Sequence, residues 1–254
     1  MTKIILITSG KGGTGKTTLS CNLAYALSEL NKKVFVIDTN LTTPNVGFQF
    51  GFSLVNSSLH DFLSGRQTLE NVIYTHKSGV KVLPGSLRLE DINDVDGEKL
   101  LEAIIRLLPV ADYIILDGAA GIGRETLNAL NICNDVIIVT NPELPAVIDS
   151  LRVIEVAKKL KKNIIGVVVN RVGARKSELP LYEIQNILGE KIIGTIPEDK
   201  NVGMSIDKRK ILMEYAPYSP AATEIRKIAY SFEGKTYKFI PQSLFYKIRK
   251  FLGF

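Results

Sequence analysis

Cysteine and histidine are scarce in this sequence of 254 residues, which contains two of each. Cys21 and Cys133 lie far apart in the chain and lack the local spacing of a metal site. His60 and His76 likewise have no other candidate ligands clustered near them. We therefore expect no metal site built from these side chains. We expect both cysteines to be small, buried, apolar residues in a reducing compartment.

Long apolar segments are also missing from the sequence. No run approaches the roughly 18 to 20 apolar residues that a membrane-spanning helix requires. The first residues, Met1-Thr2-Lys3, lead directly into an apolar strand without the features of a secretory signal. We therefore expect a cytoplasmic protein that does not span a membrane.

Positive charge is concentrated near the C-terminal end. The formal net charge of the chain is +6, and residues 233–254 contain five basic residues and one acid, Glu233, a balance of +4. The other 232 residues therefore carry only +2. A basic tail on a nearly neutral body favours a localised anionic partner. The basic residues of the tail are Lys235, Lys238, Lys247, Arg249 and Lys250.

Short apolar, β-branched segments alternate with helical segments along the chain. The predicted strands are residues 3–8, 34–38, 80–83, 113–117, 136–140, 164–169 and 192–196. The predicted helices are residues 16–30, 98–108, 146–160 and 218–232. Nearly continuous apolar strands are typical of a parallel sheet covered on both faces. We therefore expect a doubly wound α/β domain over residues 1–232, with ligands at the carboxyl ends of its mostly parallel strands.

Residues 10–17, Gly-Lys-Gly-Gly-Thr-Gly-Lys-Thr, match the P-loop pattern G-x-x-x-x-G-K-[ST]. The segment follows an apolar strand and opens an amphipathic helix, which is the context that supports such a match. Lys16 is expected to neutralise charge on the phosphates, and the Thr17 hydroxyl to bind Mg²⁺ directly. The pattern predicts ATP and Mg²⁺ as ligands. The predicted contacts are Gly10, Lys11, Gly12, Gly13, Thr14, Gly15, Lys16, Thr17 and Thr18.

Two aspartates stand at the ends of predicted strands. Asp38 ends the strand Val-Phe-Val-Ile-Asp, and Asp117 ends the strand Tyr-Ile-Ile-Leu-Asp. Strand-terminal aspartates are often turn or capping residues. Alongside a P-loop, however, both are expected to hold Mg²⁺ through water, as a Walker B aspartate does.

The motifs together resemble the MinD/ParA family of P-loop ATPases, which have a deviant Walker A motif with a lysine at the position of Lys11. Residues 38–45 and 117–121 resemble the family's first and second switches, and the similarity covers almost the whole chain. Segments 139–143 and 196–199 are more similar to the MinD branch than to the DNA-partition branch.

The resemblance implies that two subunits dimerise face to face with ATP between them. Lys11 would then reach the phosphates bound by the partner subunit, so that nucleotide binding and dimerisation become one event. The catalytic residues implied are Lys11, Lys16, Asp38 and Asn40. The residues implied for the adenine end are Asn170, Arg171, Pro197, Glu198 and Asp199.

Two positions depart from the family pattern. Asn40 stands where the family usually has a second aspartate that positions the attacking water. An amide can orient water but cannot accept a proton. We therefore expect an ATPase that is slow without an activating partner. Ala119 stands where the family often has proline, which predicts a looser second switch.

The C-terminal tail has helical periodicity after Pro241. Its apolar residues repeat at spacings i, i+1, i+4, i+7 and i+8, and its basic residues lie off that face. We expect a linker over residues 233–240 and an amphipathic helix over 241–254 that binds an anionic membrane, as in the MinD branch. The alternative is a terminal helix docked on the protein's own core. The expected membrane-contacting residues are Leu244, Phe245, Lys247, Ile248, Arg249, Lys250, Phe251 and Leu252.

The leading hypothesis is a MinD-like ATPase that cycles between a cytosolic subunit and an ATP dimer held reversibly on the inner face of the cell membrane. It would position division or surface machinery together with an unidentified activating or cargo protein. The alternative is a ParA-type ATPase that binds DNA through lysine-rich segments such as 158–162 and 208–210. We favour it less, because lysines at 158–162 also suit a helix C-terminus and those at 208–210 a solvated surface.

Two further classes that use the same motifs fit the sequence poorly. Iron–sulfur carriers require cluster cysteines, and the paired cysteines of such proteins are missing here. A small-molecule ligase would require a separate substrate-binding insertion, and none is visible in the sequence.

Overall fold

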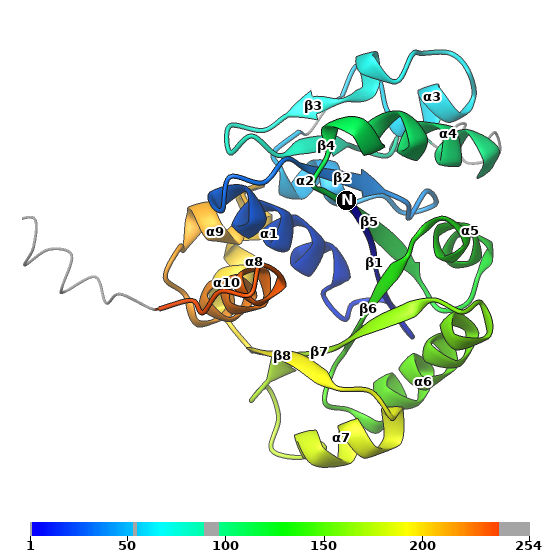
Figure 1. Ribbon diagram of the computed structural model, residues 1–254. Helices are drawn as coiled ribbons and strands as arrows, with labels where there is room; N and C mark the ends of the chain where they lie inside the picture. Colours follow the sequence, from blue (N-terminus) through cyan, green and yellow to red (C-terminus); the bar gives the residue numbers. More distant parts are fainter. Residues whose placement is uncertain (1, 53–54, 89–96, 239–254) are drawn as a thin grey trace, which may run out of the picture.

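One eight-stranded sheet organises the computed structural model, which describes residues 2–52, 55–88 and 97–238 (Figure 1). The strand order is β3-β4-β2-β5-β1-β6-β7-β8. Neighbouring strands run parallel except β3 and β4, which pair antiparallel. The strands are β1 (Lys3–Ser9), β2 (Val34–Asp38), β3 (Tyr74–Thr75), β4 (Lys81–Leu83), β5 (Tyr113–Ala120), β6 (Asp135–Thr140), β7 (Asn163–Val172) and β8 (Ile192–Pro197). The predicted doubly wound, mostly parallel sheet is confirmed.

The alternation of side chains along each central strand divides the core into two layers. In β1, Ile5 and Ile7 enter one layer, and Ile4 and Leu6 enter the other. These residues are buried because each face of the sheet is covered by helices, which explains why the strands are apolar along their whole length.

Helices cover the two faces in separate groups (Figure 1). One face carries α1 (Lys16–Glu29), α2 (Val46–Gln49), α8 (Lys200–Asp207), α9 (Leu212–Tyr215) and α10 (Pro220–Phe232). The other carries α3 (Leu59–Leu63), α4 (Gly97–Leu107), α5 (Arg124–Ile132), α6 (Leu144–Lys159) and α7 (Leu181–Leu188). Two short 3₁₀ helices are η1 (Glu70–Val72) and η3 (Leu108–Val110). No helix in the described part of the chain has both the length and the apolar character needed to cross a bilayer.

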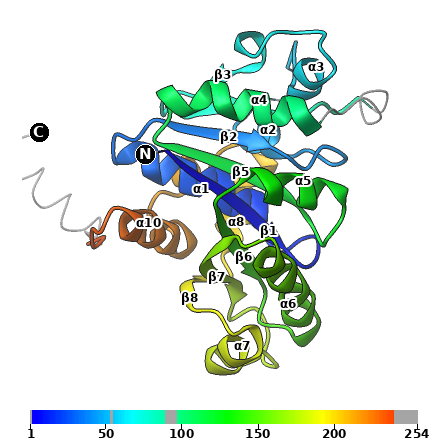
Figure 2. The same cartoon turned by 45° about the vertical axis from the view of Figure 1, so that its right-hand side comes forward.

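The end of α10 is fixed to the edge of the sheet at which the strands begin. The Glu233 carboxylate accepts a hydrogen bond from the Tyr113 hydroxyl and pairs with Lys32. Figure 2 shows the N-terminus and the end of α10 on the same side of the molecule, and β1 running away from them. The start of the expected linker therefore lies at the edge opposite the P-loop. The expected helix over 241–254, with all its membrane-contacting residues, lies outside the described residues.

Candidate nucleotide-binding site

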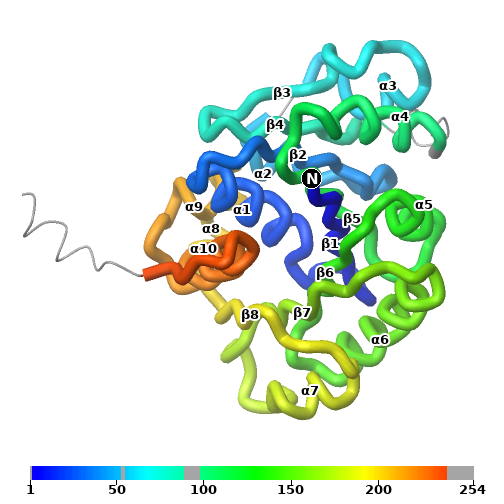
Figure 3. Tube along the Cα trace, viewed as in Figure 1, coloured from blue at the N-terminus to red at the C-terminus, as the bar shows by residue number. Residues whose placement is uncertain are grey.

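The P-loop joins the end of β1 to the start of α1, and two of its glycines are required by close contacts. A Cβ atom at Gly10 would lie 2.2 Å from the carbonyl carbon of Asp149, because the backbone of α6 passes directly against the loop (Figure 3). Gly15 has a φ of +96°, and a Cβ there would lie 2.1 Å from Nδ2 of Asn170. The spacing of the motif identified both glycines, but their contacts with α6 and β7 come only from the fold.

Lys16 and Thr14 are the buried polar groups of the loop. Lys16 is only 8% exposed, and burial lowers its pKa, although the negative charge of Asp117 opposes that change. The Thr14 hydroxyl oxygen is buried and has no hydrogen-bond partner among the described residues. A buried cation and an unpaired hydroxyl beside glycine backbone fit the oxygen atoms of a triphosphate.

Asp38 and Asp117 are direct neighbours on β2 and β5 and are both fully buried. Burial raises the pKa of Asp117 to about 6, while hydrogen bonds from the Thr17 and Ser20 hydroxyls, both 2.7 Å long, and the charge of Lys16 favour its ionised form. Burial and the nearby Asp117 raise the pKa of Asp38 well above its usual range. Two buried carboxylates beside Thr17 form the oxygen-rich environment that Mg²⁺ prefers.

Ser20 is a site residue that the sequence analysis missed. Its hydroxyl lies 2.7 Å from Asp117 Oδ1 and 3.0 Å from the Lys16 carbonyl oxygen. It stands one helical turn after Lys16 and three residues after Thr17, on the face of α1 that meets β5. That spacing was the available signal, because side chains three and four residues apart share one face of a helix.

The first switch is closed by its own polar side chains. The Asp38 carboxylate accepts backbone N–H groups of Asn40, Asn45 and Val46. The Asn40 amide donates to the Thr43 carbonyl at 2.8 Å and accepts from the Thr43 hydroxyl at 3.1 Å. Asn40 therefore holds the loop in this state, with both ends of its amide on Thr43.

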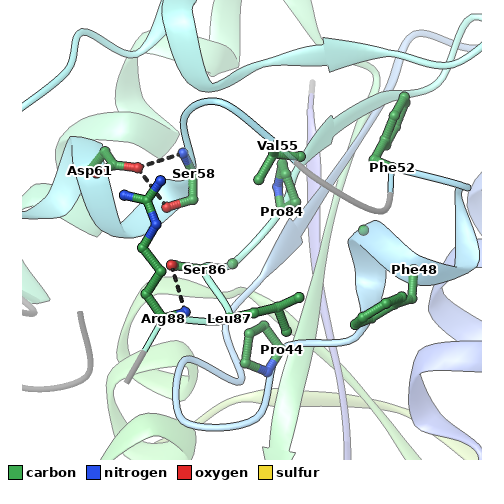
Figure 4. Close-up of a pocket in the computed structure, with 12 residues that line it drawn as sticks. Pro44, Phe48, Phe52, Val55, Ser58, Asp61, Pro84, Ser86, Leu87 and Arg88 are labelled. Carbon is green, nitrogen blue, oxygen red and sulfur yellow. Dashed lines mark hydrogen bonds between the residues drawn. The ribbon is translucent and has the colours of Figure 1, made fainter. Parts of the chain in front are cut away.

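A cavity of about 130 Å³ lies beside the first switch (Figure 4). Pro44 and Phe48 form one side of it, and Pro84 and Leu87 contribute from the segment after β4. A Cβ at Gly85 would lie 2.4 Å from Cβ of Pro44, so the segment after β4 presses on the switch. The cavity therefore shares a wall with the loop that is hydrogen-bonded to Asp38.

The second switch extends β5. Ala119 is buried, and its carbonyl oxygen accepts a hydrogen bond of 2.9 Å from the Thr8 hydroxyl. Ala120 pairs with Ser9 of β1. The segment is held in this state, and a loosening caused by the missing proline stays a prediction.

The residues expected at the adenine end meet at one cavity of about 220 Å³. Asn170 donates to the Thr14 carbonyl at 2.7 Å, which ties this cavity to the P-loop. The Asp199 carboxylate instead accepts the backbone N–H groups of Asn201 and Ala221, so it caps α8 and holds the start of α10. Part of the cavity wall, not anticipated from the sequence, is apolar: Ile196, Val202, Ile206, Ala221 and Ile225. The other predicted residues at this cavity are Gly15, Thr18, Arg171, Pro197 and Glu198.

Lys11 differs from Lys16 in its surroundings. Its side chain is 37% exposed, and its Nζ lies 3.3 Å from Glu143 Oε2. Glu143 is the residue immediately before α6. The sequence placed Glu143 in a family-like segment, but it gave no sign of this contact between positions 132 residues apart.

Comparison with known proteins gives consistent similarities. Residues 5–212 match the family model described as the CobQ/CobB/MinD/ParA nucleotide binding domain. An ATP-binding protein of Methanocaldococcus jannaschii is 38% identical, with 92% of this chain and 89% of that protein covered. The flagellum site-determining protein YlxH of Helicobacter pylori is 32% identical, with 90% and 81% covered. The structure of the septum site-determining protein MinD of Pyrococcus horikoshii, complexed with Mg-ADP, superposes with a TM-score of 0.88 at 35% identity, covering 92% and 96%.

Proposed function

The chain belongs to the CobQ/CobB/MinD/ParA nucleotide-binding family, and we propose that it is a MinD-like ATPase that dimerises on binding ATP and attaches to an anionic membrane through its C-terminal segment. The observation that carries the proposal is the different placement of two lysines in one loop. Lys16 is buried beside Asp117, whereas Lys11 is partly exposed at the start of α6. An outward lysine supplies a phosphate contact that becomes available only to a second subunit.

Hydrolysis of ATP would depend on positioning and electrostatics, because phosphoryl transfer requires little covalent chemistry from the protein. Bound Mg²⁺ neutralises charge on the phosphates. Thr17 would hold the ion directly, and Asp38 and Asp117 would hold it through water. A divalent cation favours the ionised form of both aspartates, whose pKa burial raises. Asn40 cannot accept a proton from water, and this supports slow turnover until an activating protein binds.

The substitution Asn40→Asp tests the slow turnover. We expect the single-turnover rate of ATP hydrolysis to rise by about tenfold or more, because a carboxylate can orient and deprotonate water. The substitution also removes the donor to the Thr43 carbonyl and so frees the loop. Rapid-quench measurement with excess protein gives the rate independently of product release.

Asn45→Asp is the matched control for Asn40→Asp. It adds the same charge to the same loop and also removes an amide donor to the Thr43 carbonyl. We expect its rate to equal that of the wild type. A rate for Asn40→Asp that is unchanged or slower would mean that this position does not limit hydrolysis.

Membrane attachment is proposed to depend on two tails acting together. A single short amphipathic helix binds an interface weakly and reversibly. A dimer carries two such helices, so the second binds at a high effective concentration. ATP would thereby control membrane residence without any change within the tail itself. Glu233, at the end of α10, is bonded to Tyr113 and Lys32, so each subunit of the proposed dimer would carry its tail at the edge of the sheet opposite the P-loop.

Deletion of residues 240–254 is expected to abolish binding to anionic vesicles. We expect wild-type protein to sediment with phosphatidylglycerol vesicles in ATP and to remain mostly in solution in ADP. The shortened chain should still bind ATP but stay in solution in both nucleotides. Vesicles of neutral lipid provide the control for charge. Retention of ATP-dependent vesicle binding by the shortened chain would contradict the role of the tail.

The DNA-partition alternative receives less support from the basic segments. Lys158 pairs with Glu190 at 2.7 Å, and Lys162 donates to two backbone carbonyl groups at the end of α5. Arg209 lies over the ring of Phe48 at 5.9 Å. Three of the seven cations in segments 158–162 and 208–210 thus already contact other groups of the protein. Salt-sensitive, ATP-dependent DNA binding that survives the deletion would nevertheless favour the partition ATPase.

The cellular role proposed is the placement of division or surface machinery. One relative is a septum site-determining protein and another a flagellum site-determining protein, which points to the same general task at different sites in the cell. The shared requirement is an ATPase that marks a site on the membrane for a partner protein. Imaging of tagged full-length and shortened chains tests this role. Membrane foci that depend on the tail support it, and nucleoid association opposes it.

A further inference from the structure

The direction of Lys11 is set by α6 and not by its own phosphate loop. Its carbonyl oxygen accepts a hydrogen bond of 2.7 Å from the Ser9 hydroxyl, which fixes its backbone. Its Nζ lies 3.3 Å from Glu143 Oε2 within the same subunit. The lysine thus has an anionic partner before any second subunit arrives.

Glu143 is held firmly in place. Its backbone N–H donates to the Asn141 carbonyl at 2.8 Å, and its carbonyl accepts from Val147 in the first turn of α6 at 3.0 Å. The backbone of α6 presses on Gly10, immediately before Lys11. Backbone packing therefore fixes the distance between residue 143 and the P-loop. This places the Glu143 carboxylate within reach of Lys11.

The second oxygen of Glu143 connects it to the loop after β7. Arg175 Nη1 lies 3.3 Å from Glu143 Oε1. That loop is closed by Glu178, which accepts the N–H groups of Gly173 and Arg175, and it is tied back by a bond from Leu179 N–H to the Pro142 carbonyl. The carboxylate therefore bridges two cations, one in the P-loop and one beside a cavity of about 280 Å³.

We propose that Glu143 is the resting counter-ion of Lys11 and that release of this ion pair sets the ATP concentration at which two subunits dimerise. The inference rests on the proposed ATP-dependent dimer. In the proposed dimer the Lys11 ammonium turns from Glu143 to the phosphates of the partner subunit, so each subunit gives up one ion pair when the dimer forms. A triphosphate carries more charge than one carboxylate and displaces it, but only when the second subunit brings the phosphates within reach. Glu143 is thus a positioning residue.

The expected size of the effect follows from the exposure of the pair. The two side chains are 37% and 25% exposed, and ion pairs of this kind change an equilibrium by roughly 1.5- to 5-fold. A dimer releases two pairs. Removing the counter-ion should therefore tighten the dimer by about 2- to 30-fold.

The test is Glu143→Gln in the full chain, studied by sedimentation with Mg²⁺ and a non-hydrolysable ATP analogue. We expect tighter dimers than in the wild type, with unchanged affinity of single subunits for a fluorescent ADP. Glu143→Asp retains the charge, so it should dimerise at nearly the same nucleotide concentration as the wild type. Arg175→Gln is the matched control, because it removes the other ion pair of the same carboxylate and leaves Lys11 paired. It should not tighten the dimer.

The outcomes separate this inference from the proposed function. If the wild type dimerises with the analogue and Glu143→Gln dimerises equally or more weakly, the counter-ion role is wrong and the proposed function stands. A weaker dimer would place Glu143 in contacts between subunits. If neither protein dimerises, both the inference and the ATP-dependent dimer are overturned. General damage from the substitution would lower the affinity, so a gain cannot arise from it.

Discussion

Lys11→Ala is expected to separate ATP binding from dimerisation. The variant should bind ATP through Lys16 and Thr17 but should remain a single subunit. Each dimer would lose two charge-assisted contacts with phosphates, worth about 1.5–3 kcal/mol apiece. The dimer affinity should therefore fall by about 10²- to 10⁴-fold. Light scattering after size-exclusion chromatography in Mg²⁺ and a non-hydrolysable ATP analogue measures the mass, and a fluorescent nucleotide measures binding to the single subunit.

Lys16→Ala is the comparison that makes the Lys11→Ala result specific. Lys16 is buried in the loop beside Asp117, so its removal should weaken nucleotide binding itself. The two variants should thus fail at different steps, binding for Lys16→Ala and pairing for Lys11→Ala. Normal dimers of Lys11→Ala would show that the outward lysine is an ordinary surface residue. Loss of nucleotide binding in Lys11→Ala would show that it serves its own phosphate loop.

Gly10→Ala is expected to destabilise the fold strongly. The new methyl group would lie 2.2 Å from the Asp149 carbonyl carbon and 2.3 Å from the Ser150 backbone nitrogen. These are backbone atoms of a 16-residue helix, so relief requires displacing α6 and not one side chain. Overpacking of this kind costs about 1–3 kcal/mol and sometimes more, and we expect the upper end of that range. Urea unfolding of nucleotide-free protein measures the loss.

Gly12→Ala is the matched control in the same loop. No described atom lies within 4 Å of a Cβ at Gly12, and its φ is not in the left-handed region. We expect a change in the free energy of unfolding within about 0.5 kcal/mol. Equal stability of the Gly10→Ala and Gly12→Ala variants would mean that α6 does not rest on the loop as described. A large loss at both positions would instead indicate a general intolerance of side chains in the P-loop.

Sequence patterns predicted the features that are local in the chain. The apolar strands, the long helices α1, α4, α6 and α10, and the P-loop all depend on short spacings that can be read directly. Among the shorter helices that were not predicted, α2 and α9 have four residues each, about one helical turn, which is too short to leave a period in the sequence. Strand β3 has two residues and is also too short to leave a pattern.

The parts of the site that sequence could not supply are contacts between distant segments. Glu143 meets Lys11 only because the sheet brings β6 beside β1 and α6 packs on Gly10. Asp199 caps α8 through a local bond from Asn201, but it also holds the start of α10, because Ala221 donates to it across 22 positions. Motifs identified which residue types meet at the carboxyl ends of the strands, and packing determined which atoms they contact.

The anchored end of α10 affects how sharp the border of the membrane-attached protein would be. Glu233 is bonded to Tyr113 and Lys32 at the edge of the sheet farthest from the P-loop, so ATP has no direct contact with the start of the tail. If the proposed function holds, membrane attachment then depends on ATP only through dimerisation. The density of attached protein would vary with the square of the local subunit concentration, so a shallow gradient in the cytosol would become a steep border on the membrane.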